Sequence, residues 1–223
     1  MGMQVALIPV IEIGYANQGV ELPDKWPCWQ YPAIWDRYRE ESHSKAGFKT
    51  PLIPFQPGLP LYRLADIAEE SLVKLTKDHT EDLRNGVYGR AHASAFFGGY
   101  ILEVEGEAKF YPQCCGDLSD IVYWEKLSNE TVSAYNGHPA PDVNIEGHII
   151  QFDFSEEKQD EAFQPTPSSS SLLIETDALK TAVEKVAIEL EDLSQRLIAI
   201  NFRENLKIEN IDQLLIWADN VHD

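Results

Sequence analysis

The chain has few basic residues, and this scarcity excludes a class of partner. Its 223 residues hold 18 lysines and arginines against 37 aspartates and glutamates, a formal net charge of −19. A surface of that sign repels phosphate groups and anionic lipid. Because the sequence also lacks a basic helix or basic cluster, nucleic-acid binding is not expected.

Long apolar runs and paired cysteines are also missing. No stretch reaches the roughly 20 consecutive apolar residues that a membrane-spanning helix needs, so no membrane association is expected. The apolar segment 1–13 lacks a basic leader and is interrupted by Glu12, unlike a signal peptide. The three cysteines are Cys28, Cys114 and Cys115, an odd number that does not fit a secreted disulfide framework. We therefore expect a cytoplasmic protein.

The common motifs of cofactor and metal binding are absent from the sequence. It contains neither GxGxxG nor GxxxxGK[ST], and Gly98-Gly99 belongs to no phosphate loop. Its six histidines are widely spaced, without a C-x-x-C or a zinc-type histidine pair. We expect no cofactor and no structural metal site.

What is present is an ordinary globular composition, with 43% hydrophobic residues, enough to form a packed core. β-branched residues over 5–13 predict a strand, with Pro9 at an edge or a bulge. Residues 99–111 predict a β-hairpin that turns at Gly106. A further strand is predicted at 145–154.

Helical periodicity predicts a helix over 63–75, and Asp117 is typical of the N-cap of a second helix at 118–127. Apolar stripes at 179–200 and 211–221 predict a C-terminal helical pair. We therefore expect an α+β protein, in which an antiparallel sheet is covered by helices.

Residues 155–171 are charged and then rich in proline and serine, the composition of a linker or mobile loop. This divides the chain into an α+β domain at 1–154, the linker or loop at 155–171, and a helical segment at 172–223. We expect the helical segment to pack on the main domain. Its stripe at 179–200 is also long enough to form the seam of a homodimer.

Two adjacent thiols, Cys114 and Cys115, lie between a predicted strand and a predicted helix start. A helix N-terminus can lower a thiol pKa, and a nucleophilic cysteine also needs a nearby histidine. His92, His138 and His148 are available for this role. The sequence therefore offers a candidate catalytic pair of thiol and imidazole.

A structural interpretation of the same thiols is two small buried side chains at a tight turn. Asp117 and Asp120 follow closely, and their negative charge would raise the pKa of a nearby thiol. These two acids are also candidates for binding a basic partner.

Two further groups have binding potential. Glu103, Glu105 and Glu107 are spaced by two, which places them on one face of a regular strand, either as an acidic site or as a solvated outer face. A proline-rich stretch carries four aromatic residues that form either a peptide- or sugar-binding surface or a buried cluster: Trp26, Trp29, Tyr31 and Trp35.

The acidic residues are unevenly distributed along the chain. After residue 60 lie 31 of the 37 acids and 13 of the 18 bases, so this part carries −18 of the net −19. We therefore expect a protein-binding or inhibitory module that engages a basic partner. In size, acidity and mixed composition the chain resembles bacterial immunity proteins that neutralise basic toxins. The alternative is a hydrolase or transferase that uses the thiolate of Cys114 or Cys115 with a histidine, and the acidity can also serve solubility alone.

Overall fold

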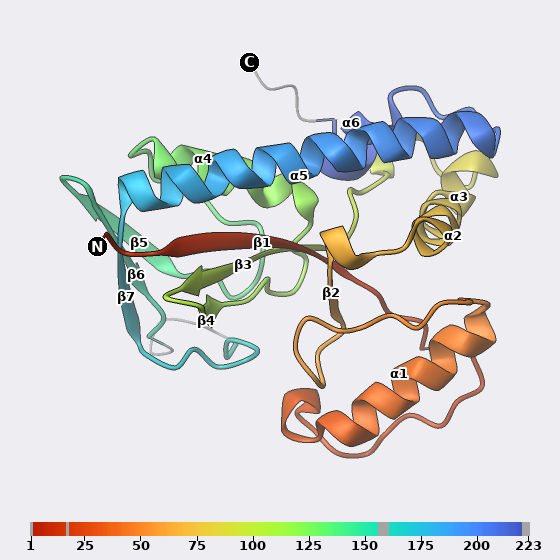
Figure 1. The fold of residues 1–223 in the computed structure, drawn as a ribbon, viewed down its shortest axis with the longest axis horizontal. Coiled ribbons are helices and arrows are strands. Elements are labelled where there is room, and N and C mark those ends of the chain that lie inside the picture. Colours follow the sequence, from red (N-terminus) through yellow and green to blue (C-terminus); the bar gives the residue numbers. More distant parts are fainter. Residues whose placement is uncertain (1, 17, 156–160, 220–223) are drawn as a thin grey trace.

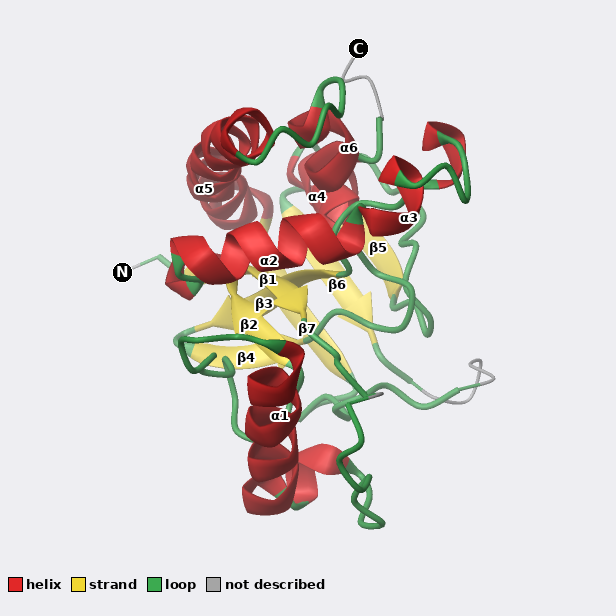
Figure 2. Cartoon of the chain, turned by 90° about the vertical axis from the view of Figure 1, so that its right-hand side faces the viewer, coloured by secondary structure: helices red, strands yellow, loops and turns green. Residues whose placement is uncertain are grey.

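The computed structural model describes residues 2–16, 18–155 and 161–219. Its strands form two antiparallel sheets (Figures 1 and 2). The first sheet has the order β2-β1-β3-β4, with β1 at Val5–Glu12, β2 at Leu61–Arg63, β3 at Gly98–Val104 and β4 at Glu107–Phe110. The second has the order β5-β6-β7, with β5 at Asp142–Glu146, β6 at Ile149–Asp153 and β7 at Ser171–Glu175.

The helices lie on opposite sides of the first sheet. They are α1 at Pro32–Ala46, α2 at Glu69–His79, α3 at Glu81–Arg84, α4 at Ile121–Ser128, α5 at Thr176–Arg203 and α6 at Ile211–Trp217. In Figure 1, α5 runs along one side of the sheet with α4 and α6 near it, whereas α1 stands on the other side, beyond β2. The expected α+β class and the C-terminal helical pair, α5 and α6, are confirmed.

Strand β1 is apolar throughout because both of its faces are covered. Leu7 and Ile11 join the large core under α5, whereas Ile8 and Val10 join a smaller core with α1. A strand buried on both sides has an unbroken apolar run rather than an alternating one. Pro9 lies beside a free edge of β1, because β2 pairs only with residues 10–12.

Two predicted elements differ from the structure. The strand expected at 145–154 is part of a hairpin, β5 and β6, that turns at Gly147 and belongs to a second sheet. The helix expected over 63–75 begins only at Glu69, because residues 61–63 pair with β1 and residues 64–66 form a 3₁₀ turn.

The segment predicted as a linker lies partly outside the described residues, which omit 156–160. Beyond that gap Phe163 is 1% exposed, and the Gln164 amide donates a 2.9 Å hydrogen bond to Gln113 Oε1. Strand β7 then pairs with β6, and α5 packs against β1. The division into units at 154 and 172 stays a prediction.

The stripe on α5, which is long enough for a homodimer seam, is buried within the chain. Its buried members are Leu179, Val183, Val186, Leu190, Leu193, Leu197 and Ile200. They face β1, α4 and α6 of the same chain.

Within the described residues, no helix has the length and apolar character needed to cross a membrane.

Candidate functional site

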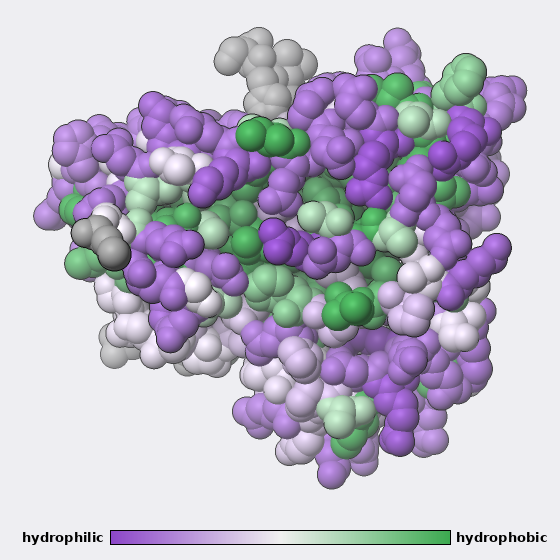
Figure 3. Space-filling model, in the orientation of Figure 1, coloured by the Kyte–Doolittle hydropathy of each residue, from purple (hydrophilic) through white to green (hydrophobic). Residues whose placement is uncertain are grey.

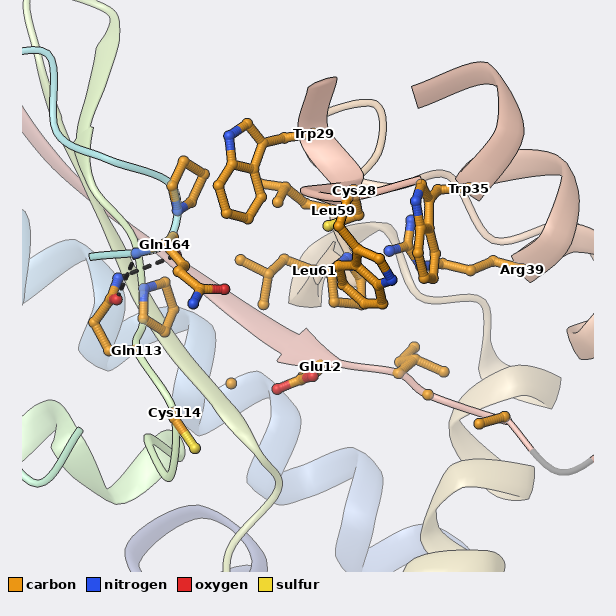
Figure 4. A pocket seen from close by; sticks show the side chains of 18 of the residues that line it. Glu12, Cys28, Trp29, Trp35, Arg39, Leu59, Leu61, Gln113, Cys114 and Gln164 are labelled. Carbon is orange, nitrogen blue, oxygen red and sulfur yellow. Dashed lines mark hydrogen bonds between the residues drawn. The ribbon is translucent and has the colours of Figure 1, made fainter. Parts of the chain in front are cut away.

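A cavity of about 630 Å³ lies between α1, the end of β1 and two loops of the chain. One loop contributes residues 112–115, and the other contributes 161, 162, 164 and 165. The segment between β1 and α1 also lines the cavity, with Trp26 and Trp29. Figure 4 shows Trp35 and Arg39 entering from α1, Glu12 from the end of β1, and Cys114 from the first of these loops. The cavity therefore joins segments that are far apart in the sequence.

Three of the four aromatic candidates, Trp26, Trp29 and Trp35, line this cavity and are called the aromatic wall here. The rings of Trp26 and Trp35 meet edge to face with centroids 4.3 Å apart. Trp35 is buried, and its Nε1 donates a 2.7 Å hydrogen bond to the Lys25 carbonyl oxygen. Trp26 is 59% exposed. The fourth candidate, Tyr31, lies outside the cavity lining, with Lys25 Nζ 5.6 Å from its ring centroid.

Helix α1 is bounded by ordinary helix signals. Pro32 occupies its first turn, where a missing N–H costs no hydrogen bond. Gly47 ends it in the left-handed conformation with φ 94°. Between these ends, one helical face is buried although it is largely polar, and its members are Trp35, Tyr38, Arg39, Ser42 and His43.

Three polar atoms of this face lack hydrogen-bond partners among the described residues. Arg39 is 8% exposed, and its Nη1 atom has only a 3.7 Å ion pair with Asp36 Oδ1. Its guanidinium carbon lies 5.3 Å from the Trp35 ring centroid. Ser42 Oγ and His43 Nε2 are buried without a partner. Unsatisfied buried polar atoms are rare and need a physical explanation.

His43 is the buried histidine of this face, and its Nε2 atom has no hydrogen-bond partner among the described residues. Burial lowers the pKa of His43, with a further small lowering from the nearby charge of Arg39. A lowered pKa favours the neutral form of the ring at neutral pH.

Glu12 is an acidic side chain that lines the same cavity as the polar face of α1. Its side chain is open to the cavity, but the surrounding protein removes enough water to raise its pKa. The positive charge of Arg39 opposes this rise. We call the group formed by Glu12, Arg39, Ser42 and His43 the polar end of the cavity.

Of the predicted catalytic residues, the structure brings Cys114, Cys115 and His138 to one cavity. The two Sγ atoms are 3.5 Å apart, and the His138 amide donates a 2.9 Å hydrogen bond to the Cys114 carbonyl oxygen. The pKa of the Cys114 thiol is raised, first by its hydrogen bond with Cys115 and then by negative groups that include Glu161 and Glu12. A raised thiol pKa leaves less thiolate at neutral pH.

The two acids near these thiols, Asp117 and Asp120, cap the start of a helix. The Asp117 side chain accepts a 2.8 Å hydrogen bond from the Ser119 amide, and the Asp120 side chain accepts one of 3.3 Å from the Asp117 amide. Asp117 is thus the N-cap that the sequence predicts, here of a 3₁₀ turn leading into α4. Because the cap occupies amides at this helix start, those amides are not free to stabilise a thiolate.

The remaining predicted site residues lie apart from the cavity. Glu103, Glu105 and Glu107 do not share a strand face, because Glu105 is in the turn with φ 54° and Glu107 begins β4. His148 is exposed between β5 and β6, with its Nδ1 2.7 Å from Glu130 Oε1. The expectation of an acidic strand face is therefore wrong.

The polar end was not identified by sequence analysis. The pattern that could have identified it is the spacing of Arg39, Ser42 and His43 along the helix face that begins with Trp35. This spacing is helical, but polar residues on a helix normally indicate its solvent side.

Comparisons with known proteins give no identification, because no protein-family model, curated protein or solved structure matches the chain. Among the described residues, no group of three or more His, Cys, Asp or Glu side chains is arranged to hold a metal ion.

Proposed function

We propose that the protein is a binding module, in the manner of an inhibitory immunity protein, that engages a basic partner protein at the mouth of this cavity. The observation that supports the proposal most directly is Trp26, a large side chain of the aromatic wall that is 59% exposed. Exposed tryptophan is costly in water and is enriched among the residues that dominate binding energy at interfaces.

Charge supports a basic partner. The net charge of −19 attracts cationic proteins over distance and raises their association rate. At the cavity itself, Glu12 and Glu161 line the same cavity as the indole rings. Carboxylates and aromatic faces together suit a lysine or arginine side chain, through ion pairing and cation–π contact.

The test is calorimetric titration with a short arginine-rich peptide, using an acidic peptide of equal length as the control ligand. We expect binding of the basic peptide only, and a weaker affinity when salt rises from low to physiological concentration. Trp26→Ala should weaken binding by about tenfold or more, as removal of an interface hot spot does.

Val87→Ala is the matched variant, because Val87 is 68% exposed and does not line the cavity. It should bind the peptide as the wild type does. Equal affinity for the two peptides, or an equal effect of the two substitutions, would contradict the proposal.

A cysteine hydrolase or transferase is the second candidate function. It is supported by the meeting of Cys114, Cys115 and His138 at one cavity, and opposed by the raised pKa of Cys114. Alkylation with iodoacetamide at neutral pH distinguishes the two candidates. The binding proposal expects uniformly slow labelling of the native protein, whereas one unusually fast thiol would favour the enzyme.

A further inference from the structure

The polar end of the cavity can bind chemical groups that the aromatic wall cannot bind. Arg39 is 8% exposed, and its Nη1 atom is buried without a hydrogen-bond partner among the described residues. Its nearest carboxylate, Asp36, is 3.7 Å away, and the same Asp36 oxygen accepts a 2.8 Å hydrogen bond from the Gly58 amide. A guanidinium carries five N–H donors in a flat fork, so this one has unused capacity for an acceptor.

A carboxylate lies nearby but is not paired with Arg39. Within the described part of the chain, Glu12 forms no ion pair with Arg39, although the charge of Arg39 acts on it. The two side chains line one cavity as separate opposite charges. This arrangement fits a ligand that presents an anion to Arg39 and a cation to Glu12.

We propose that the polar end binds a free α-amino acid in its zwitterionic form, with a large apolar or aromatic side chain. The carboxylate would bind the guanidinium of Arg39, the geometry in which the fork of arginine is most effective. The ammonium would bind Glu12, and the side chain would lie on the aromatic wall. The volume of about 630 Å³ lies in the range of small-molecule sites.

The charges of the polar end favour a zwitterion over simpler ligands. A carboxylate without an amine would face the negative charge of Glu12 without compensation, and an amine without a carboxylate would face Arg39 in the same way. His43 is neutral and so adds no charge. Ser42 Oγ and His43 Nε2, on the same helix face, also lack hydrogen-bond partners in the part of the chain that the structure describes. The amino-acid site shares Glu12 and the aromatic wall with the proposed protein-binding surface, but its contact between a carboxylate and Arg39 is additional to that surface.

The experiment is calorimetric titration with L-phenylalanine and with two derivatives that each lack one charge. N-acetyl-L-phenylalanine has no ammonium, and L-phenylalaninamide has no carboxylate. We expect the parent amino acid to bind on the order of ten-fold more tightly than either derivative, as loss of a charge-assisted hydrogen bond predicts.

Two substitutions assign each charge to its partner. Glu12→Gln should weaken binding of phenylalanine and remove its advantage over the N-acetyl derivative, while keeping its advantage over the amide. Arg39→Met should also weaken binding of phenylalanine. It should remove the advantage of phenylalanine over the amide and keep its advantage over the N-acetyl derivative. Glu146→Gln is the control, because Glu146 is exposed on β5 away from the cavity. Glu12→Gln changes an exposed side chain, so it keeps the proposal testable if Arg39→Met fails to fold.

Three results would overturn the proposal. These are the absence of binding by phenylalanine, leucine and tryptophan, equal affinity for phenylalanine and its derivatives, and unchanged discrimination in Glu12→Gln. Tight binding of N-acetyl-L-phenylalanine alone would indicate a simple carboxylate site instead. Failure here leaves the arginine-rich peptide titration unaffected, so the two proposals can fail separately.

Discussion

Gly98 shows how a single residue determines the geometry beside the cavity. Its φ is 131°, and a Cβ atom at this position would lie 2.3 Å from the Val10 carbonyl oxygen and 2.9 Å from Ile11 Cα. Only glycine permits so close an approach of β3 to β1. Its neighbour Gly99 also has a positive φ, of 128°. Gly98 therefore serves strand packing.

We predict that Gly98→Ala lowers the free energy of unfolding by at least about 3 kcal/mol, because backbone atoms must move and a positive φ becomes strained. Gly106→Ala is the matched control, since Gly106 also has a positive φ, 77°, but no atom lies within 4 Å of the added carbon. Gly106→Ala should lower the free energy of unfolding by about 1 kcal/mol, which is the cost of a left-handed backbone for alanine alone. Urea denaturation measures both. Equal losses would contradict the role of the close contact.

Asp120 is a buried acid whose environment disfavours its charge. Burial first, and then the nearby charge of Asp117, raise the pKa of Asp120 to about 7. Because this pKa exceeds that of an unfolded aspartate, the native state binds more protons between about pH 4 and pH 7. The stabilising contribution is therefore present at low pH and is lost as pH rises toward 7.

We predict that the free energy of unfolding contributed by this group falls by roughly 1 kcal/mol per pH unit over that range. Asp120→Asn should flatten the pH dependence, since the amide does not titrate. Asp66→Asn, at an exposed aspartate, should leave it unchanged. Urea denaturation from pH 5 to pH 8 gives the comparison. A wild-type slope equal to that of Asp120→Asn would contradict the assignment.

At the scale of elements, local signals predicted some structures and long-range contacts decided others. The hairpin over 99–111 and the Asp117 cap follow from neighbouring residues, and the structure has both. Strand β2 and the late start of α2 depend on pairing between residues 61–63 and β1, which no local pattern encodes.

For the same reason, the sequence predicted only part of the candidate site. Aromatic residues at 26–35 and the thiols at 114 and 115 are visible as residue types, but their meeting in one cavity is a property of the fold. Helix α1 was missed because a proline-rich stretch surrounds its start and polar residues lie on its buried face. Its Pro32 is compatible with a helix only because it stands in the first turn.

The loop that closes one side of the cavity is held by Phe163. Its ring centroid lies 5.6 Å from that of Phe154 and 6.2 Å from that of Phe110, and it is 1% exposed. We predict that Phe163→Ala lowers the free energy of unfolding by about 3–5 kcal/mol. Phe202→Ala, at a ring that is 89% exposed, should change it by less than about 0.5 kcal/mol.

Limited proteolysis gives a second measurement of the same prediction. Cleavage between residues 161 and 170 should be faster in Phe163→Ala than in the wild type, because the loop loses its buried anchor. Equal rates, together with equal stability, would show that Phe163 does not hold this loop.

At the scale of the whole molecule, the acidic surface and the cavity have different roles. The net charge of −19 acts over distance on any cationic partner, whereas the aromatic wall and the polar end recognise groups by contact. The apolar stripe on α5 is buried within the chain, and the face of the molecule seen in Figure 3 is mostly hydrophilic. The central claim is therefore that the cavity between α1 and β1 is where this protein binds its ligands.

The most direct test follows the indole N–H signals of the five tryptophans by two-dimensional NMR during titration. The probes are the arginine-rich peptide and L-phenylalanine, added separately. We predict that the signals of Trp26, Trp29 and Trp35 shift with saturation, while those of Trp124 and Trp217, which do not line the cavity, stay in place. If neither probe shifts the three cavity signals, or if all five move together, the claim is contradicted.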